Sequence, residues 1–333
     1  MSVDITADRD VGGAIVTPPR RRRRIPRALA WAVVTPFAAW AVARVAGLEQ
    51  GALVTQIMTG TPYVAAGSLL PVVLAALARS RAVTAVALIT AAALGSSVLP
   101  RAIGSSETAG TPLRVLTLNL LFGGAEPETV TALVRRLRPD VLSTQELTPE
   151  MVGKLDAAGL RELLPHRLLA PEPGASGSGL YARYPLEPLE GMFRPVGHNM
   201  PAATITLPGV KPVEIVDVHP YAPMEEHIRE WTAALEAFPP AVPDRIRILA
   251  GDFNASLDHA AMRRFLSRGY ADSADRAGRG LTPTWPANKR IPPLITIDHV
   301  VVDQRVQVNE VSVHTVPGTD HRAVFADLRL PLP

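Results

Sequence analysis

Three long apolar runs occupy most of the first hundred residues, and they constrain the fold more than any other feature of the chain. They cover residues 28–48, 61–78 and 82–99. Each is close to the roughly 20 residues that an α-helix needs to cross the about 30 Å of hydrocarbon in a bilayer. None carries the polar stripe that is typical of a helix in a soluble core. We therefore predict a transmembrane region of about three helices over residues 28–99.

Other interpretations of these runs stay open. A cleaved signal peptide would explain only the first run, and it would leave two apolar runs without a purpose. Helices buried in a soluble core are a second alternative, although the runs lack a polar face. Because the runs are rich in alanine and only modestly apolar, two crossings instead of three are also compatible with the sequence.

The arginines predict how these helices are oriented. A cluster of arginines between residues 20 and 27 precedes the first run, and Arg79 and Arg81 separate the second from the third. Residues 49–60 contain no Lys or Arg, and we expect them to form a loop. Because basic segments stay in the cytoplasm, three crossings place the rest of the chain outside it. We expect Arg44 to extend to the outer interface. The predicted location is the cell membrane, multi-pass, with an extracytoplasmic C-terminal domain.

The remaining boundaries follow from composition. Residues 1–27 are predicted to be a disordered basic N-terminus, since they are polar, small and unpatterned before the arginine cluster. Residues 100–112 (PRAIGSSETAGTP) are predicted to be an exposed linker because Gly, Ser, Thr and Pro dominate them. The folded domain is expected over residues 113–331.

Charge and cysteine content exclude several functions. The first 100 residues carry ten Lys and Arg against four Asp and Glu, so the rest of the chain carries 24 against 27, a net charge of −3. That balance is not typical of a domain that binds nucleic acid through charge alone. The chain contains no cysteine, which excludes disulfide scaffolds, thiolate zinc sites and cysteine nucleophiles.

From Arg114 onward the pattern changes to short β-rich runs, loops rich in Pro and Gly, and a few amphipathic helices. Strands are expected over residues 114–120, 141–145, 179–182, 203–207, 213–218, 246–250, 296–302 and 323–330, and helices over 127–137, 149–163, 225–238 and 259–268. Because strands outnumber helices and do not alternate strictly with them, an α+β layered sandwich is favoured over a doubly wound sheet.

Polar side chains that can hold ligands lie at or just after the ends of these strands, where rigid scaffolds place their chemistry. They belong to the segments TLN, TQE, GSG, VDVH, GDFN, TIDH and GTDH. The residues concerned are Asn119, Glu146, Ser178, His219, Asp252, Asn254, Asp298, Asp320 and His321.

This set, in this order, resembles the endonuclease/exonuclease/phosphatase superfamily, the deoxyribonuclease-I-like metal-dependent phosphoesterases. The resemblance extends from about Arg114 to Leu330. It implies a four-layer α/β/β/α sandwich, in which two sheets pack face to face with helices outside, and a divalent metal in a cleft at one edge.

The resemblance also implies a metal site formed by Asn119, Glu146 and Asp320. Carboxylate and amide oxygens suit Mg²⁺ or Mn²⁺, which prefer hard ligands. Zinc is disfavoured, because the chain has no cysteine and its histidines are scattered.

The remaining roles belong to catalysis and substrate binding. In the family pattern Asp252 orients or deprotonates the attacking water, and Asn254 holds a phosphate oxygen or the metal shell. His219 and His321 are expected to donate hydrogen bonds to the phosphate. Asp298 is expected to raise the pKa of one of these two histidines, and the sequence leaves open which one. The substrate-binding candidates are Ser178 and Trp285.

The predicted function is a membrane-anchored, metal-dependent phosphodiesterase or phosphatase, whose partners are a phosphoester substrate and the bilayer. The superfamily hydrolyses many phosphoesters, so family alone does not determine the substrate. A nuclease-type substrate is placed ahead of a lipid headgroup phosphodiester of the sphingomyelin or phosphoinositide kind. A catalytically decayed, membrane-anchored binding module is the alternative from another class. No protein partner can be inferred.

Overall fold

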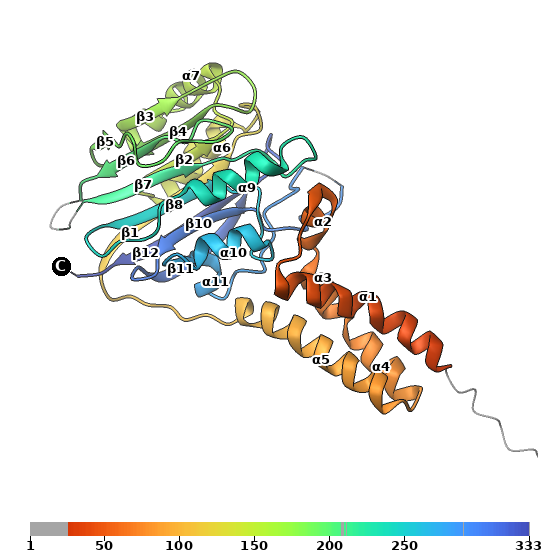
Figure 1. Ribbon diagram of the computed structural model, residues 1–333. Helices are drawn as coiled ribbons and strands as arrows, with labels where there is room; N and C mark the ends of the chain where they lie inside the picture. Colours follow the sequence, from red (N-terminus) through yellow and green to blue (C-terminus); the bar gives the residue numbers. More distant parts are fainter. Residues whose placement is uncertain (1–25, 208–209, 211, 289, 333) are drawn as a thin grey trace, which may run out of the picture.

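A computed structural model of the chain describes residues 26–207, 210, 212–288 and 290–332. Figure 1 shows a helical part, formed by the first third of the chain, attached to one side of a sandwich of sheets and helices. The predicted disordered N-terminus, residues 1–27, lies outside the described residues except for its last two.

The helical part contains the three apolar runs. Its elements are α1 (Arg27–Ala46), α2 (Gly51–Met58), α3 (Thr61–Gly67), α4 (Leu69–Leu77), α5 (Arg81–Val98) and the short 3₁₀ helix η1 (Leu99–Ala102). Two stretches, 27–46 and 81–102, are long and apolar enough to cross a membrane. A third candidate exists if α2 and the stretch 61–77, bent by 62° against each other, count as one span. The sequence prediction of about three apolar helices therefore corresponds to two or three candidate spans.

Small side chains form the centre of this bundle. Ala30 and Val34 of α1 pack against Ala75 of α4 and against Val83 and Ala87 of α5. Small residues let helix backbones approach closely, as in helix pairs within membranes. The larger apolar side chains lie on the outside of the bundle and are exposed: Leu29, Val42, Leu70, Val73, Leu88 and Ile89.

The segment between the first two runs differs from the expectation. Residues 49–60 were expected to form a loop, but they contain α2. The sequence after Gly51 (ALVTQIM) has no residue that breaks a helix, and the helix packs against the sandwich, where the Gln56 amide donates to the Pro223 carbonyl at 3.0 Å. Tertiary contact of this kind stabilises a helix that would be too short to persist alone.

The sandwich consists of two six-stranded mixed sheets. The first has the order β11-β12-β1-β2-β4-β3 and the second β5-β6-β7-β8-β10-β9. The strands are β1 (Thr111–Asn119), β2 (Val141–Gln145), β3 (His166–Ala170), β4 (Ser178–Ala182), β5 (Leu186–Pro188), β6 (Ala202–Ile205), β7 (Val213–Val218), β8 (Ile246–Asp252), β9 (Tyr270–Asp272), β10 (Asp298–Asp303), β11 (Gln307–Thr315) and β12 (Arg322–Leu330). Only the described pairs β1–β2 and β7–β8 are parallel.

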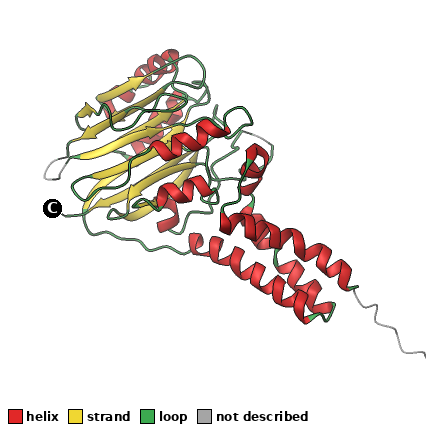
Figure 2. Cartoon of the chain, viewed as in Figure 1, coloured by secondary structure: helices red, strands yellow, loops and turns green. Residues whose placement is uncertain are grey.

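Three apolar cores separate four layers, visible in Figure 2. One core lies between the two sheets, where Val115 and Leu180 of the first sheet pack with Ile215 and Val300 of the second. The outer layers are formed by α6 (Pro127–Leu137), α7 (Pro149–Ala157) and α8 (Leu160–Leu163) on the first sheet, and by α9 (Ile228–Ala237), α10 (Ala260–Leu266) and α11 (Ser273–Arg276) beside the second. Val130 and Leu155 belong to the first outer core, and Trp231 and Phe265 to the second. The predicted α/β/β/α sandwich is confirmed.

The two parts of the chain are joined by more than a linker. Arg44, at the end of α1, does not extend to an interface as expected; it is buried and its Nε lies 2.8 Å from Asp258 Oδ1. Arg101 of η1, inside the predicted linker, makes a bidentate pair with the same carboxylate at 2.8 and 2.6 Å. The backbone amides of Ser105 and Glu107 then donate to the sandwich, and β1 already begins at Thr111. The expected exposed linker is therefore held along the sandwich.

Candidate active site

The strands bring the predicted site residues to one edge of the sandwich. Parallel pairing places Asn119, the last residue of β1, beside Gln145, the last residue of β2. Antiparallel pairing in the other sheet places Asp298, the first residue of β10, beside Asp252, the last residue of β8. Because the two sheets pack face to face, these ends meet at the same edge.

Asn119 connects two acidic side chains at this edge. Its amide nitrogen donates to Glu146 Oε1 at 3.0 Å and to Asp252 Oδ2 at 3.1 Å. Its amide oxygen accepts from the backbone N–H of Leu121 at 2.9 Å, which determines the orientation of the amide. In this arrangement Asn119 acts as a donor that holds two carboxylates together. Its predicted role as a metal ligand through oxygen stays a prediction.

Glu146 lies in an unusual backbone conformation, with a φ of 55°. Strained backbone of this kind persists where the surrounding structure holds it, and it is frequent at active sites. The carboxylate accepts from the Phe122 N–H at 2.8 Å through Oε2. Burial raises the pKa of Glu146, and the nearby Asp320 carboxylate raises it further. A cation in this position would relieve both effects.

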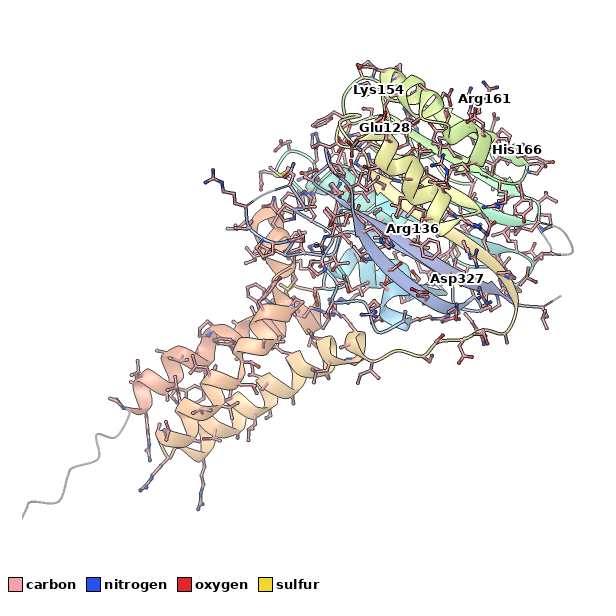
Figure 3. All side chains as sticks on the ribbon, turned by 180° about the vertical axis from the view of Figure 1, so that it is seen from behind. Glu128, Arg136, Lys154, Arg161, His166 and Asp327 are labelled. Carbon is pink, nitrogen blue, oxygen red and sulfur yellow. The ribbon has the colours of Figure 1, made fainter. Side chains whose placement is uncertain are left out.

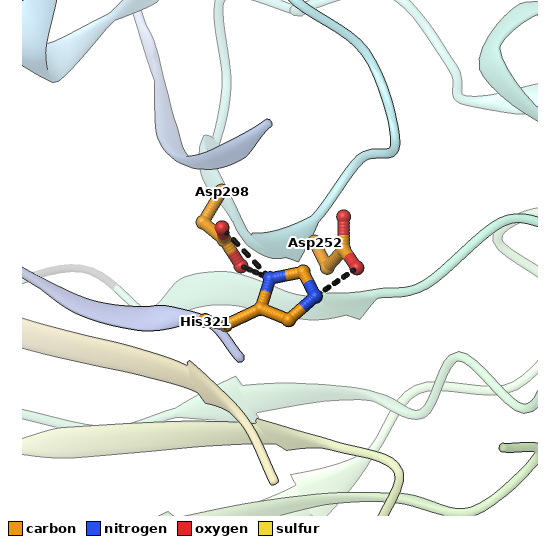
Figure 4. Close-up of side chains that lie close together, drawn as sticks. All are labelled: Asp252, Asp298 and His321. Carbon is orange, nitrogen blue, oxygen red and sulfur yellow. Dashed lines mark hydrogen bonds and ion pairs between the residues drawn. The ribbon is translucent and has the colours of Figure 1, made fainter. Parts of the chain in front are cut away.

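His321 is the histidine that Asp298 supports. Its Nδ1 lies 3.0 Å from each carboxylate oxygen of Asp298, and its Nε2 lies 3.7 Å from Asp252 Oδ2 (Figure 4). Burial lowers the pKa of His321, but the charges of Asp298 and Asp252 outweigh burial and raise the pKa to about 10. The imidazole is therefore protonated at neutral pH and faces the site as a hydrogen-bond donor.

Asp252, the last residue of β8, is buried at the floor of the site. Its Oδ1 accepts from the Asn254 N–H at 2.8 Å, and Asn254 turns back through a left-handed φ of 49° to donate its own side chain to the Pro220 carbonyl at 3.1 Å. Burial raises the pKa of Asp252 to about 7, although the nearby His321 acts to lower it. A carboxylate with a pKa near 7 can accept a proton from water at neutral pH.

His219 lies near the same carboxylates, but its Nδ1 faces another histidine, whereas the Nδ1 of His321 faces the Asp298 carboxylate. The Nε2 of His219 lies 4.0 Å from Glu146 Oε1 and 3.9 Å from Asp252 Oδ2, while its Nδ1 faces His198 Nδ1 at 3.1 Å. Burial lowers the pKa of His219 well below its usual value, and the adjacent His198 lowers it further. His219 is therefore neutral, and it can donate from only one ring nitrogen.

Asp320 faces the cleft, and only one of its carboxylate oxygens accepts a hydrogen bond. Its Oδ2 accepts from the indole N–H of Trp285 at 3.0 Å. Its Oδ1 is buried, has no hydrogen-bond partner among the described residues, and lies 3.8 Å from His321 Nε2. A buried carboxylate oxygen without a partner is costly unless a cation or water completes its surroundings. Trp285 therefore orients Asp320 as well as lining the cleft.

Ser178, the other predicted substrate contact, begins β4 and is completely buried. Its hydroxyl has no hydrogen-bond partner among the described residues, and Ala175 of the preceding loop lines the cleft instead. Contact between Ser178 and a substrate stays a prediction.

The donor set fits a hard divalent cation. Glu146 and Asp320 are carboxylates on the same cleft, and Mg²⁺ typically binds through one or two carboxylates while keeping several waters. Among the described residues, Asp252, Asp298 and His321 bring ligand atoms within 4.8 Å of one another. A protonated imidazole cannot act as a metal ligand. For this reason Glu146 and Asp320 are the better candidates.

A cleft of about 690 Å³ is lined by most of the predicted site residues, though not by Asn119, Ser178 or Asp298, and by residues that the sequence did not point to. Gln56 and Thr59 come from the helical part, His198 from a loop, and Phe122 and Met224 from the rim. No motif marks them, because they enter the cleft only through contacts between segments distant in sequence. His299, by contrast, is packed in the core, where its two ring nitrogens lie 2.8 Å from Asp272 and from the Ala255 carbonyl.

Comparison with known proteins agrees with the geometry. The model of the Endonuclease/Exonuclease/phosphatase family matches residues 116–321, which is more than half of the chain. The chain belongs to this family. Family members hydrolyse phosphoester bonds and depend on divalent metals, so the chain is classed as a phosphoester hydrolase.

Solved structures of the family share the sandwich. An endonuclease/exonuclease/phosphatase from Beutenbergia cavernae has a TM-score of 0.50 at 20% identity, covering 66% of this chain and 72% of that one. TDP2 of D. rerio, complexed with a single-strand DNA product, has a TM-score of 0.53 at 17% identity, covering 66% and 99%. A family protein from Bacteroides vulgatus has a TM-score of 0.51 at 19% identity, covering 66% and 100%. A search of curated proteins gave no significant match.

Proposed function

We propose that the chain is a membrane-anchored, divalent-metal-dependent phosphoester hydrolase whose active site lies outside the cytoplasm. The observation that carries the chemistry is the convergence of Asn119, Glu146, Asp252, Asp320 and His321 on one cleft. These residues come from separate strand ends of both sheets, and a fold has no structural need to bury so many carboxylates in one place.

Each side chain has a role that its surroundings support. Glu146 and Asp320, with Asn119 beside them, would hold Mg²⁺ or Mn²⁺, and the ion would supply stabilisation of negative charge on the phosphoryl oxygens. Asp252 orients the attacking water and accepts its proton. His321 donates to a phosphate oxygen where charge develops, and Asp298 keeps it protonated and oriented. Asn254 and the neutral His219 add donors, and Trp285 forms a wall of the cleft.

The membrane proposal is supported by the positions of the charges. Arg27 begins α1, Arg79 lies in the turn between α4 and α5, and Arg81 begins α5, which packs against α1 in the bundle. The sandwich is attached at the opposite ends of these helices, where Arg44 and Arg101 lie. By the positive-inside rule, the arginine-rich end is cytoplasmic and the sandwich is extracytoplasmic.

The test is hydrolysis of a soluble phosphodiester, bis-p-nitrophenyl phosphate, by the full-length protein in detergent. We expect turnover with Mg²⁺, loss of turnover with EDTA, and a decrease of at least about 10²-fold for Asp252→Asn, since a general base typically contributes that much. Asp244→Asn, the same change at an exposed position, is the control. Equal turnover by Asp252→Asn and the wild type would rule out the proposed role.

A further inference from the structure

One wall of the catalytic cleft is formed by the helical part of the chain. Gln56 of α2 and Thr59 line the cleft together with the catalytic carboxylates. Gln56 donates to the Pro223 carbonyl at 3.0 Å, and the Tyr63 hydroxyl donates to the Leu294 carbonyl at 2.6 Å. The cleft is therefore situated where the apolar helices meet the sandwich, and not on the far side of the sandwich.

Buried ion pairs fix this arrangement. Asp258 is buried and accepts from both Arg44, in the last turn of α1, and Arg101, in η1 directly after α5. His259, also buried, lies with its Nε2 2.8 Å from the Thr55 carbonyl of α2. A carboxylate shared by two buried guanidinium groups cannot separate from them without leaving charges unpaired. The cleft is held beside the helices and does not swing freely on a linker.

The mouth of the cleft is apolar. Phe122, Met224 and Leu294 line it and have 57%, 48% and 42% of their surface exposed. On the α2 side, Leu53 and Ile57 are also exposed. Exposed apolar side chains around a polar catalytic floor are typical of a site for a ligand that has an apolar portion.

The described residues that line the cleft do not supply the positive charge typical of a nucleic-acid site. Among its described lining residues none is Lys or Arg. Binding of DNA usually involves about 6–10 phosphate contacts from basic side chains. Lys154 and Arg161 lie at the end of the sandwich far from the helical part (Figure 3). A ligand with a single phosphate needs far fewer basic partners than a nucleic acid does.

We propose that the substrate is a phosphoester of a membrane lipid, which enters the cleft from the bilayer surrounding α1 and α5. The proposal rests on the proposed function and specifies its substrate class. The phosphate binds at the catalytic floor, and the acyl or prenyl chain lies against the apolar rim of Phe122, Met224 and Leu294. Water forms a bond to phosphorus while the ester P–O bond breaks. The departing alkoxide takes a proton from solvent, and Asp252 returns to solvent the proton that it accepted from the attacking water, so that one water is consumed in each turnover.

The experiment uses the full-length protein reconstituted with Mg²⁺ in phosphatidylcholine vesicles that contain phosphatidylglycerol, phosphatidic acid or a polyprenyl phosphate. We measure the soluble phosphate compounds released from each lipid, including phosphatidylcholine itself. The kcat/KM for each lipid is compared with the kcat/KM for the same headgroup phosphate without its acyl or prenyl chains. We expect at least about a tenfold higher kcat/KM for a long-chain lipid, because apolar contact with the rim contributes to binding. Met224→Ser and Leu294→Ser are expected to reduce this preference.

Leu332→Ser is the matched control, because Leu332 is exposed beside Arg305, which has no part in the cleft. It is expected to keep the preference. Turnover of the soluble phosphodiester, or cleavage of an oligonucleotide, without turnover of any vesicle lipid would overturn the lipid proposal and leave the phosphoesterase intact. Failure to hydrolyse any of these compounds in the presence of Mg²⁺ would overturn the proposed function as well.

Discussion

His321 donates from Nδ1 to both carboxylate oxygens of Asp298, each at 3.0 Å. The pair is buried, and the other ring nitrogen of His321 faces Asp252 (Figure 4). It places a positively charged donor next to the carboxylate that is expected to accept a proton. The geometry therefore gives acid and base roles to two adjacent groups whose pKa values are shifted to about 10 and about 7.

Asp298→Asn is expected to move the alkaline limb of the kcat/KM profile to lower pH. The wild type keeps His321 protonated up to its pKa of about 10, and loss of the Asp298 charge lowers that pKa, so the donor is lost earlier as the pH rises. We also expect kcat/KM at pH 8 to decrease by about 10²-fold or more. Asp156→Asn, a change in an exposed pair with Arg167, serves as control. An alkaline limb that does not move would contradict the role of Asp298.

Asn119→Ala is expected to move the acidic limb to higher pH. The hydrogen bonds from Asn119 lower the pKa of Glu146 and of Asp252, so their loss leaves both carboxylates protonated over a wider range. The measurement is kcat/KM against pH at saturating Mg²⁺, together with the Mg²⁺ dependence of turnover. If Asn119→Ala instead needs a higher Mg²⁺ concentration for half-maximal turnover and its acidic limb does not move, Asn119 is a metal ligand.

Metal binding is expected to stabilise the folded protein. A ligand at one hundred times its Kd contributes about 2.7 kcal/mol to the free energy of unfolding. Thermal unfolding of the EDTA-treated full-length protein should therefore shift to higher temperature with Mg²⁺ or Mn²⁺. Glu146→Gln and Asp320→Asn should reduce the shift, and Glu150→Gln on the surface of α7 should keep it. An undiminished shift in the first two variants would place the ion elsewhere.

Asp258→Ala is expected to lower the free energy of unfolding by about 3–5 kcal/mol, because it leaves Arg44 and Arg101 buried without their carboxylate. Chemical denaturation of the detergent-solubilised chain, followed by tryptophan fluorescence, measures the change. Glu236→Ala removes an exposed pair with Arg264 and should cost less than about 1 kcal/mol. Equal effects of the two variants would show that the buried pair does not hold the two parts together.

The orientation in the membrane has its own test. An alkaline phosphatase reporter fused after residue 333 is expected to be active in cells, because it folds only after export. A fluorescent protein that matures only in the cytoplasm should stay dark when it is fused at the same position. The opposite pattern would reverse the orientation and remove the bilayer-facing substrate from the outer leaflet.

The regular features of the fold could be predicted from local sequence. Continuous apolar runs predicted α1 and α5, and β-rich runs predicted the central strands such as β1, β8 and β12. The edge strands β3, β5, β9 and β11 were missed. The segment QVNEVSVHT of β11 is largely polar and only partly buried, so its strand conformation depends on pairing with β12. The expected helix over residues 149–163 is divided at Gly159, which adopts a φ of 89°.

The candidate site residues could also be named from the sequence, because polar side chains at strand ends stand out against apolar strands, and their roles stay predictions. Tertiary structure alone decided that Asp298 supports His321, that Asn119 faces Glu146 with its nitrogen, and that Arg44 is buried on Asp258. It also decided that α2 forms a wall of the catalytic cleft. Local sequence carries the periodicity and composition that select helix or strand, whereas these partners are brought together only when the sheets and helices pack.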